Sequence, residues 1–197
     1  GNIEGYPKFL QALQEISPVP VSFELIDGNA KGFYHLEDKK IVVQDGMSEV
    51  QTIKTLLHEM AHQKLHDKDN VPEAKDISRN GKEVEAESVA YVVCQHYGIN
   101  TSDYSFSYVA GWSEGKDTPE LKASLDKIRQ TASEFIYQID QKIEVLMADK
   151  EQVQESAKAP SPFVQELMDK ITEGAKDLGF IPIVPETQEK TANPELK

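Results

Sequence analysis

The apolar residues in the first fifty positions follow a helical spacing and then the shorter periods of β-strands. Residues 6–15 have apolar side chains one helical turn apart, which predicts a short amphipathic helix. Three brief runs follow at 21–26, 32–36 and 40–44, rich in β-branched and aromatic residues and separated by turn residues. The pattern predicts a small antiparallel sheet behind one helix.

Three longer segments have apolar side chains at the spacing of α-helices. The first begins after Ser48, a good N-cap residue, and ends near His66. The second covers 82–97, and the polar stretch 73–80 before it is predicted to be a loop. The third begins at Thr118 and has one continuous apolar stripe, which indicates packing against the domain or a partner helix.

These elements predict an α+β fold in which the small sheet packs on the helix after Ser48. We expect one domain over residues 1–149, ending in the long helix. Residues 150–197 are polar and contain several prolines, so we expect an extension with one possible amphipathic helix at 163–178.

The first long helix contains the pattern His-Glu-x-x-His. Residues four apart lie on one helical face, so His58 and His62 can direct two imidazoles at a single Zn²⁺ ion. Glu59 lies at the edge of that face, where a carboxylate can take a proton from water without becoming a metal ligand. The pattern is typical of zinc metallopeptidases. A short pattern of this kind also fits an amphipathic helix with two half-exposed histidines. Its apolar flanks argue against this alternative, because they would leave both imidazoles without polar partners other than a metal ion.

A third metal ligand is expected from the second long helix. His66 lies roughly 12 Å along the helix axis from His58, too far to share the ion, and is interpreted as a surface or capping residue. Glu83 can complete a set of two histidines and one glutamate, as in gluzincins. Glu87, one turn later, can accept the ring N–H of a metal-bound histidine. Glu85 is expected on a solvated face.

Composition narrows the possible partners and the compartment. The formal net charge of −13 and the sequence pI of about 4.8 argue against direct nucleic-acid binding by this segment. Cys94 is the single cysteine, which fits a reducing cytoplasmic compartment and a core position for this thiol. No apolar run is long enough for a membrane span, and no signal peptide is evident. Because the chain begins with Gly1, we expect it to be a segment of a longer protein.

The stretches 56–62, 83–91 and 96–99 resemble the zincin-like metallopeptidase domain of ArdC-type antirestriction proteins. They are more distantly similar to the ImmA/IrrE peptidases, which usually have asparagine where this chain has Glu87, so the ArdC-like branch fits better. The resemblance covers about 21–139. It implies an origin on a plasmid or conjugative element, often beside a single-strand DNA-binding domain.

For the site, the resemblance implies zinc held by His58, His62 and Glu83, with Glu59 as the base and Glu87 outside the ligand set. The expected activity is hydrolysis of peptide bonds in a protein or peptide substrate.

Two alternatives stay open beside this hydrolase. One is a non-catalytic, metal-bound module that blocks a partner protein, in keeping with an antirestriction role, and the other is a helical scaffold with an accidental motif. If the domain is an enzyme, Tyr108, or else Tyr104, is a candidate to stabilise the transition state.

Overall fold

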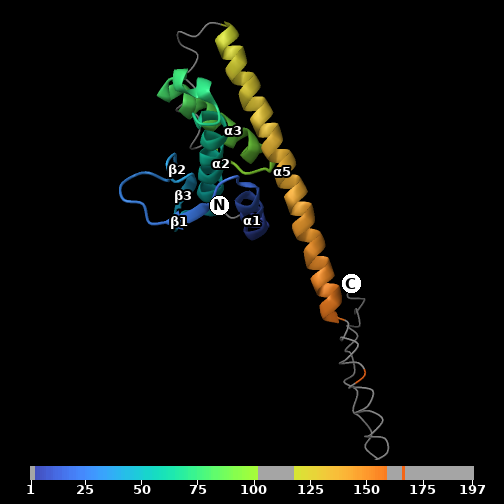
Figure 1. Cartoon of the computed structure of the whole chain (residues 1–197). Coiled ribbons are helices and arrows are strands. Elements are labelled where there is room, and N and C mark those ends of the chain that lie inside the picture. The colour runs from blue at the N-terminus through green and yellow to red at the C-terminus, as the bar shows by residue number, and fades with distance from the viewer. Residues whose placement is uncertain (1–2, 102–117, 159–165, 167–197) are drawn as a thin grey trace, which may run out of the picture. The chain divides into compact units, whose positions relative to one another are not determined.

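The computed structural model describes residues 3–101, 118–158 and 166 (Figure 1). In chain order the elements are α1 (Tyr6–Ile16), β1 (Val21–Glu24), β2 (Gly32–His35), β3 (Lys40–Gln44), α2 (Glu49–His66), the 3-10 helix η1 (Pro72–Asp76), α3 (Arg79–His96) and α5 (Thr118–Lys158). The predicted fold class, α+β, is confirmed. Apart from residue 166, the helix expected at 163–178 lies outside the described residues, and so do both candidate tyrosines.

The sheet is mixed, so the expectation of an antiparallel sheet was wrong for one pair of strands. The strand order is β1-β3-β2, with β1 parallel to β3 and β2 antiparallel to it. β3 is central because its Ile-Val-Val run is buried throughout, and such an unbroken apolar run is typical of a strand covered on both faces. A tight turn joins β2 to β3, with Lys39 in the left-handed region at φ 49.

Capping residues define where the two site helices begin. Ser48 accepts a hydrogen bond from the backbone N–H of Gln51 at the start of α2, as its N-cap position predicts. Ser78 does the same for Gly81, so α3 begins at Arg79, three residues earlier than expected. The predicted loop over 73–80 was therefore wrong, because η1 and the first residues of α3 occupy most of it.

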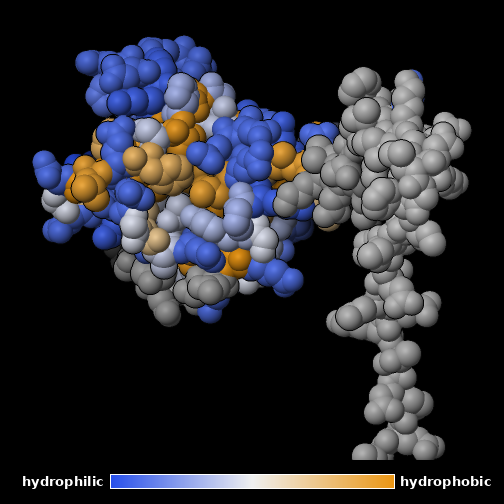
Figure 2. All heavy atoms as spheres, turned by 90° about the horizontal axis from the view of Figure 1, so that it is seen from below, coloured by the Kyte–Doolittle hydropathy of each residue, from blue (hydrophilic) through white to orange (hydrophobic). Residues whose placement is uncertain are grey.

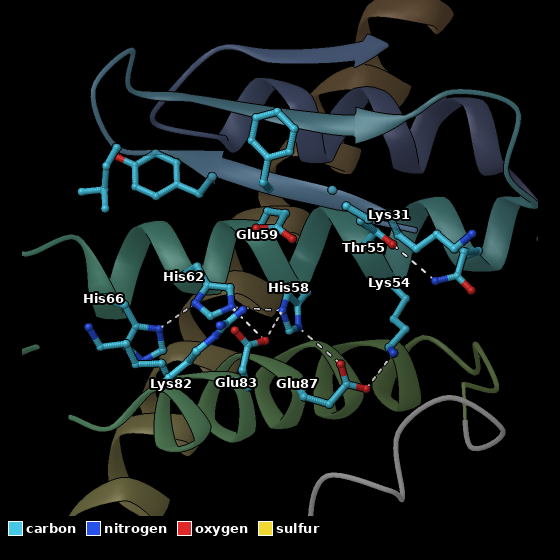
Figure 3. A pocket seen from close by; sticks show the side chains of 17 residues that line it. Lys31, Lys54, Thr55, His58, Glu59, His62, His66, Lys82, Glu83 and Glu87 are labelled. Carbon is cyan, nitrogen blue, oxygen red and sulfur yellow. Dashed lines mark hydrogen bonds and ion pairs between the residues drawn. The ribbon is translucent and has the colours of Figure 1, made fainter. Parts of the chain in front are cut away.

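The core is built around α2, which lies between the sheet and α3 (Figures 1 and 3). Its fully buried side chains include Ile53, Leu56, Leu57 and Met60. They pack in one cluster with apolar residues of α1, β3, α3 and α5. On the face shown in Figure 2, apolar residues appear between hydrophilic ones. Among the described helices none has the length and apolarity needed to cross a membrane.

The long helix α5 packs against α3 with about half of the apolar side chains in its predicted stripe. Ile128, Ala132, Phe135 and Ile139 are buried, whereas Leu125 is 51% exposed. The chain divides into two compact units, Gly1–Ala148 and Asp149–Lys197, and α5 runs from the first into the second. The functional boundary expected at residue 150 stays a prediction.

Buried Asp67, the C-cap of α2, attaches the β2–β3 hairpin to that helix. Its carboxylate accepts hydrogen bonds from the Lys39 amine at 3.0 Å and the Tyr34 hydroxyl at 2.9 Å. Burial raises the pKa of Asp67, but these bonds outweigh that effect and lower its pKa. The hairpin is thereby held over the face of α2 that contains Glu59.

Gly32 lets β2 approach α2 closely. A Cβ atom built at this residue would lie 2.6 Å from Thr55 Cγ2, 3.0 Å from the Val42 carbonyl oxygen and 3.3 Å from Glu59 Cγ. Contacts this short require the strand or the helix to shift. The glycine therefore sets the spacing between the strand and the glutamate of the motif.

We expect Gly32→Ala to lower the free energy of unfolding by about 1–3 kcal/mol, the usual range for an overpacked interior. Urea denaturation of both proteins measures the difference. Adding Thr55→Ser removes only the Cγ2 methyl and should restore part of the loss, because the contact with Val42 remains. Equal stability of Gly32→Ala and the unmodified chain would contradict the close packing of β2 on α2.

Candidate metal centre

Three ligand atoms from α2 and α3 meet between the two helices. His58 Nε2 and His62 Nε2 are 3.0 Å apart, and the Glu83 Oε2 atom lies 3.4 Å from the first and 3.6 Å from the second. Figure 3 shows both imidazoles directed from α2 toward α3, where Glu83 faces them. The structure thus brings together the three residues that the sequence predicted as ligands, and they could hold a metal ion.

The separations suit a small ion with tetrahedral geometry. Nitrogen and oxygen ligands about 2.0–2.1 Å from such an ion stand about 3.3 Å from one another. The three observed distances, 3.0, 3.4 and 3.6 Å, fall close to that value. Three protein ligands leave one tetrahedral position for water or substrate, which is typical of catalytic rather than structural zinc sites.

Glu87 lies beside the other ring nitrogen of His58. Its Oε2 atom lies 3.3 Å from His58 Nδ1, and its Oε1 atom lies 2.7 Å from the Lys54 amine. The side chains of Lys54 and Glu87 are 11% and 5% exposed, so the pair is formed in the interior. A carboxylate beside Nδ1 favours a proton on that nitrogen, which would leave Nε2 to bind a metal ion. The structure brings Glu87 and His58 to ion-pair distance, and the hydrogen bond expected between them stays a prediction.

Glu59 is buried on a different side of α2 from the histidines. Figure 3 shows it between α2 and the strands, while His58 and His62 point toward α3. Its carboxylate accepts a hydrogen bond from the backbone of Tyr34 and lines the same pocket as both histidines. It therefore borders the pocket of the three ligand atoms without belonging to their set.

The charges of the site act on one another's protonation. Burial lowers the pKa of His58, but the carboxylates of Glu83 and Glu87 outweigh burial and raise it to about 9. The two histidines hold the pKa of Glu83 well below its usual range. Burial raises the pKa of Glu59, an effect only partly opposed by the charge of His58 and His62.

His66 and Glu85 are buried, which corrects two expectations. Their side chains are 4% and 2% exposed, and His66 Nε2 lies at hydrogen-bond distance, 3.0 Å, from Glu85 Oε2. Ser124 of α5 donates to the other Glu85 oxygen at 2.7 Å. His66 was expected to be a surface or capping residue and Glu85 to lie on a solvated face, because α2 and α3 were each considered alone. The contact between them, and the one with Ser124 of α5, bury both side chains. Glu85 is nevertheless not a ligand in place of Glu83, since its carboxylate is occupied by His66 and Ser124.

The ligands border a pocket of about 620 Å³ between β2, α2 and the start of α3. Its lining includes Glu59, Glu83 and Glu87. Cys94 lies in the core as expected, and burial raises the pKa of its thiol to about 12, so it is not a reactive nucleophile. Tyr104 and Tyr108 lie outside the residues that the structure describes, so their roles stay predictions.

The sequence is similar to that of an uncharacterized Bacillus anthracis protein, pXO2-81. The two are 38% identical over 120 residues, which are 60% of this chain and 20% of the relative. The chain therefore spans about a fifth of that relative's length. No family model matches the chain, and no solved structure matches it.

We expect one divalent transition-metal ion per chain at this site. Replacing the Glu83 carboxylate by an amide, Glu83→Gln, should weaken binding by more than the ~10–100-fold that is typical for residues outside the ligand set. The affinity is measured by titrating the metal-free protein, prepared with a chelator, with Co²⁺ and recording the visible absorption of the bound ion. The exposed Glu73→Gln in η1 is the matched control and should bind like the unmodified chain. Equal affinities of the two variants would exclude Glu83 as a ligand.

Proposed function

We propose that this domain is a zinc metallopeptidase that cleaves peptide bonds in a protein or peptide substrate. The observation that carries this proposal is the convergence of His58 Nε2, His62 Nε2 and Glu83 Oε2, with Glu59 buried in the wall of the same pocket. Two imidazoles and one carboxylate with a position left open form the ligand set of a hydrolytic zinc site.

His58, His62 and Glu83 would hold the ion, and Glu87 would keep His58 oriented toward it. When bound, zinc supplies a Lewis acid that polarises a peptide carbonyl and makes water acidic enough to ionise near neutral pH. The buried Lys54–Glu87 pair fixes the orienting carboxylate, so the geometry does not depend on mobile surface groups.

Glu59 is the group that moves the proton. Its carboxylate takes a proton from the attacking water and then delivers it to the nitrogen of the leaving amine. Burial already raises its pKa, which favours holding the proton between these two events, while nearby cationic groups favour releasing it. The backbone of Tyr34 and the close approach at Gly32 restrict where this carboxylate lies.

The pocket favours an acidic substrate segment. It is lined by four cations, Lys31, Lys54, Arg79 and Lys82, and by three carboxylates. Lys54 is paired with Glu87, but within the part of the chain that the structure describes, Lys31, Arg79 and Lys82 have no carboxylate within ion-pair distance. A bound divalent cation would add two positive charges. In a chain of net charge −13, this local excess would attract acidic side chains to the cleft.

The resemblance to ArdC-type domains supports the same reaction and adds a setting on a mobile element. It also keeps a second candidate function, a metal-bound module that blocks a partner without cleaving it. Both candidates need the three ligands, but only the peptidase needs a proton acceptor at residue 59. This difference separates them experimentally.

Glu59→Gln preserves the shape of the side chain and removes the proton acceptor. The rate of hydrolysis of a substrate that the unmodified domain cleaves should fall by at least ~10²-fold, a typical contribution of a positioned base, because water is no longer deprotonated. Zinc content and melting temperature of the same preparation serve as the internal control and should change little. If the biological effect of the domain survives this substitution unchanged, the domain acts as a binding module and the peptidase proposal is wrong.

The cleavage preference tests the acidic substrate. Incubation of the zinc-loaded protein with a peptide library, followed by mass spectrometry of the products, should show Asp and Glu enriched within a few residues of the cleaved bond. Arg79→Ala combined with Lys82→Ala should reduce the enrichment by ~10-fold or more, because each lost ion pair in a cleft contributes up to about 1 kcal/mol. Basic residues at those positions, or an unchanged preference in the variant, would contradict this interpretation.

A further inference from the structure

A second set of buried polar groups continues from His62, on the side away from the metal position. His62 Nδ1 and His66 Nδ1 are 2.9 Å apart, and His66 Nε2 lies 3.0 Å from Glu85 Oε2. The hydroxyl of Ser124 donates to Glu85 Oε1 at 2.7 Å. The contacts therefore link α2, α3 and α5 in one line that ends at a proposed zinc ligand.

Burial requires each of these contacts to contain one hydrogen. His66 and Glu85 are 4% and 2% exposed in their side chains, and Ser124 is 8% exposed. A buried carboxylate needs donors on its oxygens, and two imidazole nitrogens in contact need one proton between them. The positions of the hydrogens can therefore be deduced from one end of the line to the other.

Glu85 accepts a hydrogen bond on each of its oxygens. Its Oε1 atom accepts the hydroxyl hydrogen of Ser124, and its Oε2 atom accepts a hydrogen from His66 Nε2. A neutral imidazole with its hydrogen on Nε2 has a bare Nδ1, which can only accept. His62 must then donate from Nδ1 to His66, and its own Nε2 is left with a lone pair.

We propose that His66, held by Glu85 and Ser124, is a positioning residue that fixes His62 in the tautomer able to bind zinc through Nε2. His62 Nε2 is the atom that faces His58 Nε2 and Glu83. The role matches that of Glu87 at His58, but here an imidazole stands between the histidine and the carboxylate. A glutamate of α3 thus acts on the Nδ1 side of each metal-facing histidine, directly at His58 and through His66 at His62.

This inference rests on the proposed zinc site but can be tested without measuring hydrolysis. The ring nitrogens of ¹⁵N-labelled full-length chain, recorded with and without Zn²⁺, report the tautomer of each histidine. The chain has five histidines, so single-histidine variants assign the signals. We expect the hydrogen on Nδ1 of His62 and on Nε2 of His66 in both samples. A hydrogen on Nε2 of His62 in the sample without zinc would overturn the proposal.

Two substitutions of His66 separate orientation from packing. His66→Asn puts an amide oxygen close to the former Nδ1 atom and keeps an acceptor for His62, whereas His66→Leu fills the space and offers none. Competition with a chelator should show zinc affinity reduced by about 10–100-fold in His66→Leu and largely retained in His66→Asn. His96→Leu, at an exposed histidine of α3, is the matched control and should not change the affinity.

Affinity in His66→Leu equal to that of His96→Leu would refute the positioning role. If His66→Leu does not fold, the tautomers of the unmodified chain still decide the question. If the unmodified chain takes up no zinc, the proposed function fails on that measurement alone, and the spectrum without zinc still shows whether His66 orders His62.

Discussion

The burial of ionisable groups between α2 and α3 is the constraint on which the rest of the structure depends. Lys54, His66, Glu85 and Glu87 all lie in the interior of a small domain. Removing one partner of a buried ion pair usually costs about 3–5 kcal/mol, because the remaining charge is left without compensation. The helices must therefore keep one register relative to each other, in which each of these groups meets its partner.

The other elements are attached to these two helices. The β2–β3 hairpin is attached to the end of α2 through Asp67, and Gly32 lets it pack directly over Thr55 and Glu59. α5 covers the opposite side of α3 and contributes Ser124 to the buried network. The pocket is therefore lined by β2, α2 and the start of α3. Its polar atoms are held in place without a bound ligand.

Periodicity predicted the long helices and the convergence of the three residues that could hold a metal ion. The i, i+4 spacing of His58 and His62 fixes their common face, and Glu83 could be chosen because its face continues through Ala90 and Cys94, which are buried. The same reasoning failed for His66 and Glu85, since a polar residue is assigned to solvent unless a partner for it can be named. Their partners are each other and Ser124, from three separate helices, and no local pattern predicts such a contact.

The sheet shows a second limit of local patterns. Each strand was located by its own residues, but strand order depends on which strand is covered on both faces. The uninterrupted Ile41-Val42-Val43 run was a usable signal for the central position. η1 was missed because its residues are polar and it is held by Pro72 and by backbone hydrogen bonds rather than by an apolar face.

Anomalous diffraction at the zinc absorption edge, from crystals grown with Zn²⁺ at neutral pH, tests the metal centre most directly. We expect one strong peak between His58 Nε2, His62 Nε2 and the Glu83 carboxylate, with Glu59 outside the ligand set. A peak between His62 and His66, or crystals with no peak at the motif, would contradict the proposed metal centre and the peptidase function that depends on it.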